Sequence, residues 1–315
     1  MKILAIESSC DEFSIGVIEN DKILCNVVSS QIENHKQFGG VVPELAARLH
    51  LENLNWVLNE VQEKIKLDWN TIDQVAYTAN PGLLGSLIIG KMVAETIGTY
   101  LDVPIVPLDH IEGHIFASSI DNDFVYPVLA LIVSGGHTQI ELVKSPNNFE
   151  IIGSTIDDAI GESYDKVARV LGFDYPGGPQ VDKLAQLGTP TYQLPLSKND
   201  QSYDFSYSGL KTAAINLIHN LNQKQEPIKI NDFCASFQEA ATKVIAMKLE
   251  RAIQEYKPQT LTVGGGVSAN SRIRTTIMEL GKKYQIHKTI IPKFEYCTDN
   301  GAMMAQLAYA KFTEK

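Results

Sequence analysis

Two histidines one helical turn apart, His110 and His114, are the side chains whose types and spacing point most directly to chemistry. Residues i and i+4 of a helix face the same side, so both imidazoles could bind one metal ion. A third ligand must come from elsewhere, and the best carboxylate is Asp299, at the predicted start of the last helix. The alternatives are that the histidines are surface or capping residues and that Asp299 caps that helix.

The glutamate between the two histidines limits what such a metal site could do. Glu112 lies two residues after His110, whereas the HExxH motif of zinc peptidases has its Glu directly after the first His. Glu112 is therefore expected on roughly the opposite side of the helix from the His pair. It cannot easily activate a metal-bound water there, which excludes a metallopeptidase of this type.

Three glycine-rich turns punctuate the chain, at Ser134–His137, Pro176–Pro179 and Gly264–Asn270. Glycine lets backbone N–H groups approach an anion or a flat ring without a Cβ in the way. None of the three has the spacing of a P-loop or of a dinucleotide-binding fingerprint. One such turn is usually only a tight turn, but three in one chain favour nucleotide binding.

Acidic residues accompany these turns. The segment 157–166 carries Asp158, Glu162 and Asp165 on roughly one helical face, where they could line a site. The alternative is a surface ion pair one turn apart within the same segment. Asp182 follows the second glycine turn and could bind ribose hydroxyls.

The turn after the first expected strand, Ser8–Glu12, holds two more acids, Asp11 and Glu12. Either could bind a metal-held water or act as a general base. The alternative is that they only cap a hairpin.

Composition restricts the class of protein. The 315 residues are 44% hydrophobic and 20% charged, as in an ordinary globular protein of about two domains. The net charge of −10 means that nucleic-acid binding would need a local basic patch or a partner protein. Four cysteines without CxxC spacing indicate a reduced, cytosolic protein. No apolar run approaches the roughly 20 residues of a membrane span, and Glu7 interrupts the N-terminal run, so export is not expected.

Strands alternate with helices along the chain, which predicts an α/β fold. Strands are expected at 2–7, 13–18, 22–29, 73–78, 105–108, 127–133, 139–143, 261–263 and 288–291. Helices are expected at 43–67, from 81–87 to about 101, within 155–172 and 208–256, from about 270, and at 300–311. A strand, a Ser-led turn and a strand occur at both 2–18 and 127–143, which suggests two similar halves, although any two hairpins look alike. The boundary is expected in the polar stretch 118–126.

Eight segments occur in the same order in one known family. They are IESSCDE (6–12), HKQFGGVVPE (35–44), HIEGH (110–114), SGGHT (134–138), DYPGGP (174–179), FSYSGLK (205–211), GGGVSAN (264–270) and TDNGA (298–302). The sequence closely resembles the tRNA N6-adenosine threonylcarbamoyltransferase family, the bacterial TsaD-type proteins. The resemblance covers essentially the whole chain.

The resemblance implies an α/β fold of the actin/Hsp70-like (ASKHA) type, with two lobes around a nucleotide cleft. We expect an N-terminal lobe of residues 1–118 with 298–315 as its closing helix, and a C-terminal lobe of residues 119–297 with helical insertions. The implied reaction transfers the threonylcarbamoyl group of threonylcarbamoyl-AMP to the N6 amine of adenosine 37, beside the anticodon, in tRNAs that read ANN codons.

The resemblance also assigns residues. It implies that His110, His114 and Asp299 hold one divalent metal ion per subunit, iron(II) in preference to zinc. The implied substrate-binding positions are Val133, Ser134, Gly135, Gly136, His137, Asp165, Gly178, Asp182 and Asn270. Chemically, the amides of the Gly135-Gly136 turn can bind developing negative charge, and Asp11 and Glu12 are the candidates for the base.

The implied partners, besides tRNA and threonylcarbamoyl-AMP, are a TsaB-like paralogue docked on helices of the N-terminal lobe and a TsaE-like ATPase. A cytoplasmic location without membrane attachment follows. Two departures stand out, because Phe13 replaces a usual Thr and Asn80 a usual Gly. Both lie outside the segments assigned to the metal and the adenylate.

Two other functions on the same fold remain as alternatives. A kinase-like ATPase would use magnesium, which histidine ligands do not suit. A non-catalytic scaffold would lack the metal residues and the glycine-rich turns, and both are present here.

Overall fold

The computed structural model describes residues 1–314, which form two compact units. Unit 1 contains Met1–Asp123, Ser145–Asn148 and the C-terminal segment from Pro292. Unit 2 contains Phe124–Lys144 and Phe149–Ile291. The functional lobes expected from the sequence, 1–118 with 298–315 and 119–297, remain a proposal.

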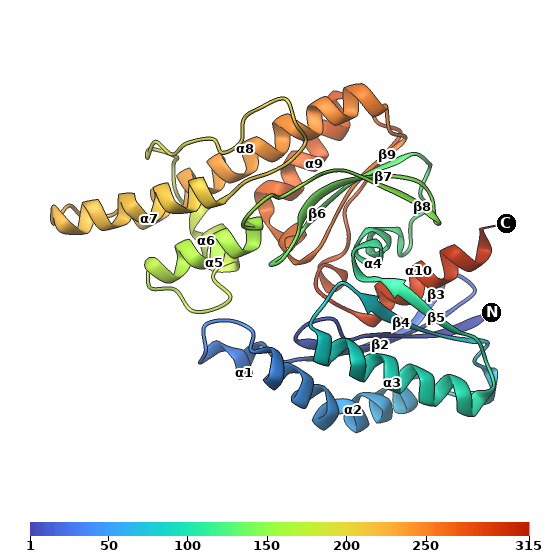
Figure 1. Ribbon diagram of the computed structural model, residues 1–315. Helices are drawn as coiled ribbons and strands as arrows, with labels where there is room; N and C mark the ends of the chain where they lie inside the picture. Colours follow the sequence, from blue (N-terminus) through green and yellow to red (C-terminus); the bar gives the residue numbers. More distant parts are fainter. Residues whose placement is uncertain (315) are drawn as a thin grey trace. The chain divides into compact units, whose positions relative to one another are not determined.

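A five-stranded sheet in the order β3-β2-β1-β4-β5 forms the centre of unit 1 (Figure 1). The first three strands form an antiparallel meander, whereas β4 and β5 run parallel to β1. The apolar residues of β1 and β2 are buried on both faces of the sheet, which explains their nearly continuous apolar runs. The strands are β1 (Lys2–Glu7), β2 (Glu12–Glu19), β3 (Lys22–Ser30), β4 (Gln74–Asn80) and β5 (Ile105–Asp109).

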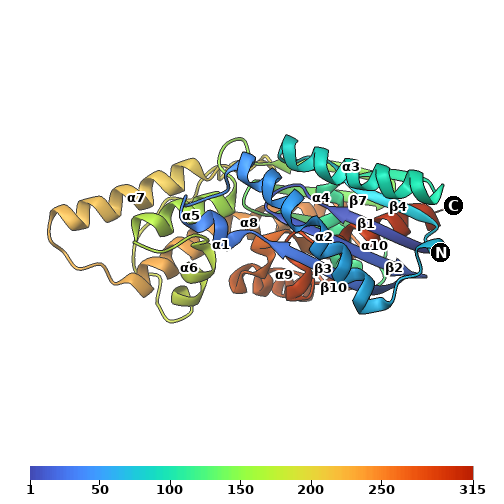
Figure 2. The same ribbon diagram turned by 90° about the horizontal axis from the view of Figure 1, so that it is seen from below.

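Helices cover both faces of this sheet (Figures 1 and 2). α2 and α3 pack together on one face, and α10 lies on the other face with α4 beside it. The helices are α1 (Ile32–Lys36), α2 (Pro43–Ile65), α3 (Leu84–Leu101), α4 (His110–Phe116) and α10 (Gly301–Thr313).

Side-chain caps determine where two of these helices begin. Asp109 Oδ1 accepts hydrogen bonds from the N–H groups of Ile111 and Glu112, at 2.8 and 3.2 Å, and so caps α4. Asn300 caps α10, because its Oδ1 accepts from the Met303 N–H at 3.0 Å. The alternative role considered for Asp299, as the cap of this helix, is therefore wrong.

The sheet of unit 2 has the order β10-β9-β6-β7-β8. It begins with an antiparallel pair, β6 and β7, and β9 runs parallel to β6. Taken from its other edge, this order is that of unit 1, with β6 in the place of β1 and β9 in the place of β4. The topology thus confirms the weak internal repeat. The strands are β6 (Val128–Val133), β7 (Thr138–Ser145), β8 (Asn148–Ser154), β9 (Thr260–Gly264) and β10 (Lys288–Ile290).

Five helices of unit 2 build its core. They are α5 (Ile160–Val170), α6 (Gly178–Ala185), α7 (Ser208–Gln223), α8 (Ile230–Tyr256) and α9 (Ser271–Lys283). Fully buried aromatic side chains, among them Tyr164, Phe205 and Phe237, join these helices to β6 and β9. Within residues 1–314, no helix is both long and apolar enough to cross a membrane.

Candidate metal centre and nucleotide-binding turns

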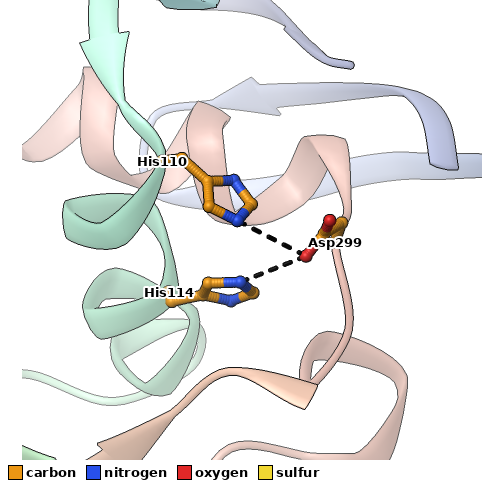
Figure 3. Close-up of side chains that lie close together, drawn as sticks. All are labelled: His110, His114 and Asp299. Carbon is orange, nitrogen blue, oxygen red and sulfur yellow. Dashed lines mark ion pairs between the residues drawn. The ribbon is translucent and has the colours of Figure 1, made fainter. Parts of the chain in front are cut away.

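His110, His114 and Asp299 lie together in unit 1 (Figure 3). Asp299 Oδ1 is 3.1 Å from His114 Nε2 and 3.6 Å from His110 Nε2. One ligand atom from each residue lies within 4.8 Å of the other two. The three side chains named from the sequence, the two histidines and Asp299, thus lie together in the structure.

Close packing of α4 and α10 brings the three residues together. A Cβ on Gly113 would lie 2.4 Å from Met304 Sδ, so the Met304 side chain occupies the space that the absent Cβ leaves between the two helices. The start of α10 also lies against β2, where a Cβ on Gly301 would be 2.1 Å from the Gly16 nitrogen. Asp299, just before α10, is thereby fixed beside the histidines of α4.

The surroundings of His114 test whether this group suits a metal ion. His114 is fully buried, and neither ring nitrogen makes a hydrogen bond within residues 1–314, although Nε2 faces Asp299. A buried polar atom without a hydrogen bond is unfavourable, so an ion held by His114 and Asp299 would give Nε2 a partner. Two imidazoles and one carboxylate suit zinc or iron(II). The residues present therefore fit one metal ion.

His110 is oriented from behind by two residues that the sequence analysis did not single out for the site. Its Nδ1 lies 3.1 Å from Glu7 Oε2 and 3.1 Å from Ser9 Oγ. A proton on Nδ1 would bond Glu7 and leave the Nε2 lone pair directed at the group. Burial alone would lower the pKa of His110, but the charges of Glu7 and Asp299 raise it to about 9.

Glu7 is itself held in place on β1. Its carboxylate accepts hydrogen bonds from the Ser9 N–H at 2.6 Å and from Thr78 Oγ1 at 2.5 Å. Burial works to raise the pKa of Glu7, yet the charge of His110 and its hydrogen bond outweigh burial and lower it. Burial likewise opposes ionisation of Asp299, but His110 and His114 lower its pKa. Both carboxylates are thus anionic at neutral pH.

Asp11 and Glu12, the candidate bases, are both buried in unit 1. Burial raises the pKa of Glu12 well above its usual value, and the charges of Asp299 and Asp11 raise it further. A raised pKa makes the carboxylate form of a glutamate a stronger base than an ordinary one. Glu12 therefore has the electrostatic environment of a proton-transfer group.

In unit 2, the turn Ser134–His137 joins β6 to β7. Ser134 Oγ accepts from the N–H groups of Gly136 and His137, at 3.3 and 3.0 Å. A Cβ at Gly135 or Gly136 would meet nothing within 4 Å, so both face open space. From the other side, a Cβ on Gly161 would lie 2.6 Å from the Ser134 oxygen. The turn is thus supported by α5 and exposed at its glycines.

Asp165 is linked to the second glycine-rich turn. Its Oδ1 accepts from the N–H groups of Gly177 and Gly178, at 2.8 and 3.2 Å. Burial raises the pKa of Asp165, although these two hydrogen bonds act in the opposite direction. Asp158 has a different environment, because it pairs with Lys166 and Lys211. The structure therefore does not group Asp158 with Asp165.

Asp182 and Asn270 are brought together by Gln238, a buried residue of α8 that the sequence analysis missed. Gln238 Nε2 donates to Asp182 Oδ1 at 2.9 Å, and Gln238 Oε1 accepts from Asn270 Nδ2 at 2.9 Å. Ser271 adds its N–H and hydroxyl to Asp182, at 3.1 and 2.6 Å. Tyr164 O–H donates to Gln238 Oε1 at 3.2 Å. No local motif signals Gln238, because it lies 32 residues from Asn270 and 56 from Asp182.

The third glycine-rich turn reaches the strand before the first one. Gly265 has a φ of +88°, and a Cβ there would lie 2.4 Å from the Val133 oxygen. Asn270 then caps α9, since its Oδ1 accepts from the N–H groups of Arg272 and Ile273. Val133, Ser134 and Gly265 are thus close neighbours in unit 2.

The fold defines the general class first. Full-length HypF resembles this structure with a TM-score of 0.64 and 14% identity, over all of this chain and 47% of the HypF chain. Component A of (R)-2-hydroxyglutaryl-CoA dehydratase from Acidaminococcus fermentans resembles it with a TM-score of 0.57 and 16% identity, over the full length of both chains. The protein therefore has the α/β fold of the actin/Hsp70-like class, as expected.

The sequence comparisons identify the family. The model of the TsaD family, tRNA N6-adenosine threonylcarbamoyltransferase, matches residues 22–306. A protein of that name from Mesoplasma florum is 67% identical over 99% of this chain and 98% of its own length. The Bacillus subtilis protein is 45% identical over 97% of this chain and 89% of its own. The chain belongs to the tRNA N6-adenosine threonylcarbamoyltransferase family, so it is a transferase that modifies tRNA. The kinase-like and scaffold alternatives are not favoured.

Proposed function

We propose that this protein transfers the threonylcarbamoyl group from threonylcarbamoyl-AMP to N6 of adenosine 37 in tRNAs that read ANN codons. The N6 nitrogen forms a bond to the carbamoyl carbon, the bond from that carbon to the phosphate oxygen breaks, and AMP leaves. The N6 nitrogen loses one proton. The cluster of His110, His114 and Asp299 in a chain of this family is the observation that carries the proposal.

We assign one divalent metal ion, iron(II) in preference to zinc, to His110, His114 and Asp299. The buried ring of His114 supports this assignment, because neither of its nitrogens makes a hydrogen bond and Nε2 faces Asp299. A bound ion would supply Lewis-acid polarisation of the donor. The chain's own contribution is to hold three ligands in a fixed arrangement, with His110 oriented by Glu7 and Ser9.

We assign the proton lost from N6 to Glu12, with Asp11 as the second candidate. The buried position and raised pKa of Glu12 support this choice. An exocyclic adenine amine is a poor nucleophile, so positioning of the two substrates should contribute most of the rate.

The adenylate is assigned to unit 2. Open glycines in the first turn and two carboxylates, held by Gly177, Gly178 and Ser271, suit an adenylate with its phosphate and ribose hydroxyls. The binding residues proposed are Val133, Ser134, Gly135, Gly136, His137, Asp165, Gly178, Asp182 and Asn270.

We propose a TsaB-like paralogue and a TsaE-like ATPase as partners. Leu84, Ile88 and Met92 follow each other at one-turn intervals on α3, with 76, 47 and 59% of each residue exposed. An apolar stripe of this kind favours a protein contact over solvent, and it supports docking of the paralogue on the helices of unit 1. Because tRNA is the substrate, we place the protein in the cytoplasm.

A transfer assay tests the proposal. Purified protein receives tRNA, its partners, labelled threonine, bicarbonate and ATP, and the wild type is compared with His110→Ala. Label in tRNA from the wild type alone is the expected result. No label from either protein, with the partners shown to be active, would reject the transferase. Equal label from both would retain the transferase and reject the metal's role.

A further inference from the structure

Three buried polar side chains of unit 1 form a hydrogen-bonded chain between a backbone N–H and a backbone carbonyl, outside the residues assigned above. The N–H of Val42 donates to His35 Nδ1 at 3.3 Å, and His35 Nε2 lies 3.3 Å from Gln31 Oε1. Gln31 Nε2 lies 2.7 Å from His50 Nδ1, and His50 Nε2 lies 3.3 Å from the carbonyl oxygen of Ser8. The side chains of Gln31, His35 and His50 are all completely buried.

The chain has one direction only. A backbone N–H must donate, so His35 Nδ1 is an acceptor and its Nε2 carries the proton. The Gln31 side-chain oxygen accepts this hydrogen bond, so the Gln31 side-chain N–H group donates to His50 Nδ1. His50 Nε2 must then donate to the Ser8 oxygen. Both histidines are thus neutral and protonated on Nε2, which agrees with burial lowering the pKa of His50.

The chain ends on a turn whose carbonyl groups are all held from outside. Each of the four carbonyl oxygens of Ser8–Asp11 accepts a hydrogen bond, and the donors come from three other segments of unit 1: α2, the start of α3 and Gln31 before α1. The donors, in the order of these acceptors, are His50 Nε2 (3.3 Å), the Leu83 N–H (2.7 Å), Ser86 Oγ (3.3 Å) and the Gln31 N–H (3.1 Å). Gln31 and His50 thus act at opposite ends of the turn.

That turn carries the residues behind and beside the metal group. Ser9 contacts His110, and Asp11 and Glu12 are the candidate bases. A displacement of about 1 Å at such residues can reduce catalysis by about a hundredfold. The orientation of the turn therefore matters more than the small net energy of each hydrogen bond.

We propose that Gln31, His35 and His50 are positioning residues. They fix the orientation of the turn Ser8–Glu12 relative to His110, and they link this orientation to the position of the segment 37–42. Packing alone would not select three polar side chains for a fully buried position, because each must then find partners. The hydrogen-bonded chain supplies these partners, and its direction is compatible with one arrangement of the turn. The part of this inference that concerns catalysis rests on the proposed function.

The test compares three variants of the full-length protein. His50→Leu removes both hydrogen bonds of the ring, whereas His50→Gln retains a donor near the Nε2 position. Val61→Ala is the matched control, because Val61 is fully buried on the same helix and takes no part in the chain. Amide NMR signals of Ser9–Glu12 and the ring nitrogen signals of His35 report the turn and the chain without any metal or activity.

We expect His50→Leu to shift the amide signals of Ser9–Glu12, and His50→Gln to restore them in part. In the transfer assay, kcat should fall about tenfold to a hundredfold for His50→Leu, with KM for threonylcarbamoyl-AMP within about twofold. Val61→Ala should lower the melting temperature and leave both readouts at wild-type values. Ring signals of a protonated Nδ1 in His35 would reject the assigned direction.

Equal effects of His50→Leu and Val61→Ala on the amide signals and on kcat would overturn the proposal, because the role would then be only structural. If His50→Leu does not fold, His50→Gln and Gln31→Met make the same comparison with Val61→Ala. If the wild type transfers nothing, the proposed function fails, and the NMR signals still decide whether the chain positions the turn.

Discussion

The first turns of the two sheets occupy equivalent places but are built in opposite ways. In unit 1, the turn Ser8–Asp11 joins β1 to β2, and all four of its carbonyls are held by other segments. In unit 2, the turn Ser134–His137 joins β6 to β7 and is closed by its own serine, with two glycines facing open space. The same topology thus gives, in unit 1, a turn that other segments hold in place and that carries charged side chains. In unit 2 it gives a turn whose glycine backbone is exposed.

This difference determines what each turn can bind. The unit 1 turn lies beside two imidazoles, the buried carboxylate of Glu7 and the partly buried carboxylate of Asp299, a set suited to a cation. The unit 2 turn exposes its backbone without side chains at Gly135 and Gly136, which lets an anion or a carbonyl oxygen approach closely, while Ser134 Oγ holds the N–H groups of Gly136 and His137. Repetition of a fold therefore need not repeat its chemistry, because the side chains that surround equivalent turns can differ in charge.

The contrast between the two turns depends most on the imidazoles of unit 1. His114→Ala removes a ligand that nothing else in the cluster can replace, so we expect loss of bound metal and a fall in transfer of more than about a hundredfold. Metal content by mass spectrometry and labelled-threonine transfer are the measurements. His219→Ala, an exposed histidine of α7, is the control. Full metal content in His114→Ala would contradict the assignment.

The second prediction concerns the support of the unit 2 turn. Gly161→Ala places a Cβ 2.6 Å from the Ser134 oxygen, so backbone must move and we expect destabilisation of about 1–3 kcal/mol. Gly135→Ala is the matched control for stability, because its Cβ would meet nothing within 4 Å. Thermal unfolding of both variants measures the difference. Equal melting temperatures would show that α5 does not brace the turn.

The histidine pair was predictable because its spacing along one helix is a local signal. Strands with continuous apolar runs, such as 128–133, were predictable for the same reason. Glu7 was not recognised as part of the site, because it acts on a residue 103 positions away and looks like one polar residue in an apolar strand. The helix 178–185 and the strand 148–154 were missed, since both are short and neither has a clear apolar pattern.

The third prediction is that the negative charge of Glu7, which faces His110 Nδ1, contributes to the affinity for the metal ion. Glu7→Gln keeps the shape of the side chain but removes the anion that orders His110 Nδ1, so metal affinity should fall about 10- to 100-fold. Glu112→Gln makes the same chemical change on α4, where the carboxylate pairs with Lys311 instead. Competition with a metal-binding dye measures both affinities. A loss in Glu112→Gln as large as in Glu7→Gln would point to net charge rather than orientation.

The smallest effect is expected in unit 2, where Asp182 accepts hydrogen bonds from both Gln238 and Ser271. Gln238→Glu replaces the amide that donates to Asp182 with a second carboxylate, so Asp182 loses a hydrogen bond and gains a repulsive neighbour. We expect the affinity for AMP to fall about tenfold, as for the loss of one hydrogen bond to a charged group. Thr242→Val is the control, because this buried residue lies one turn further along α8 and its hydroxyl bonds only backbone carbonyls. Calorimetric titration with AMP measures both variants. Wild-type affinity in Gln238→Glu would mean that Ser271 and the backbone N–H groups at the start of α9 are enough to hold Asp182 and Asn270, and unit 2 would then depend less on side chains than unit 1 does.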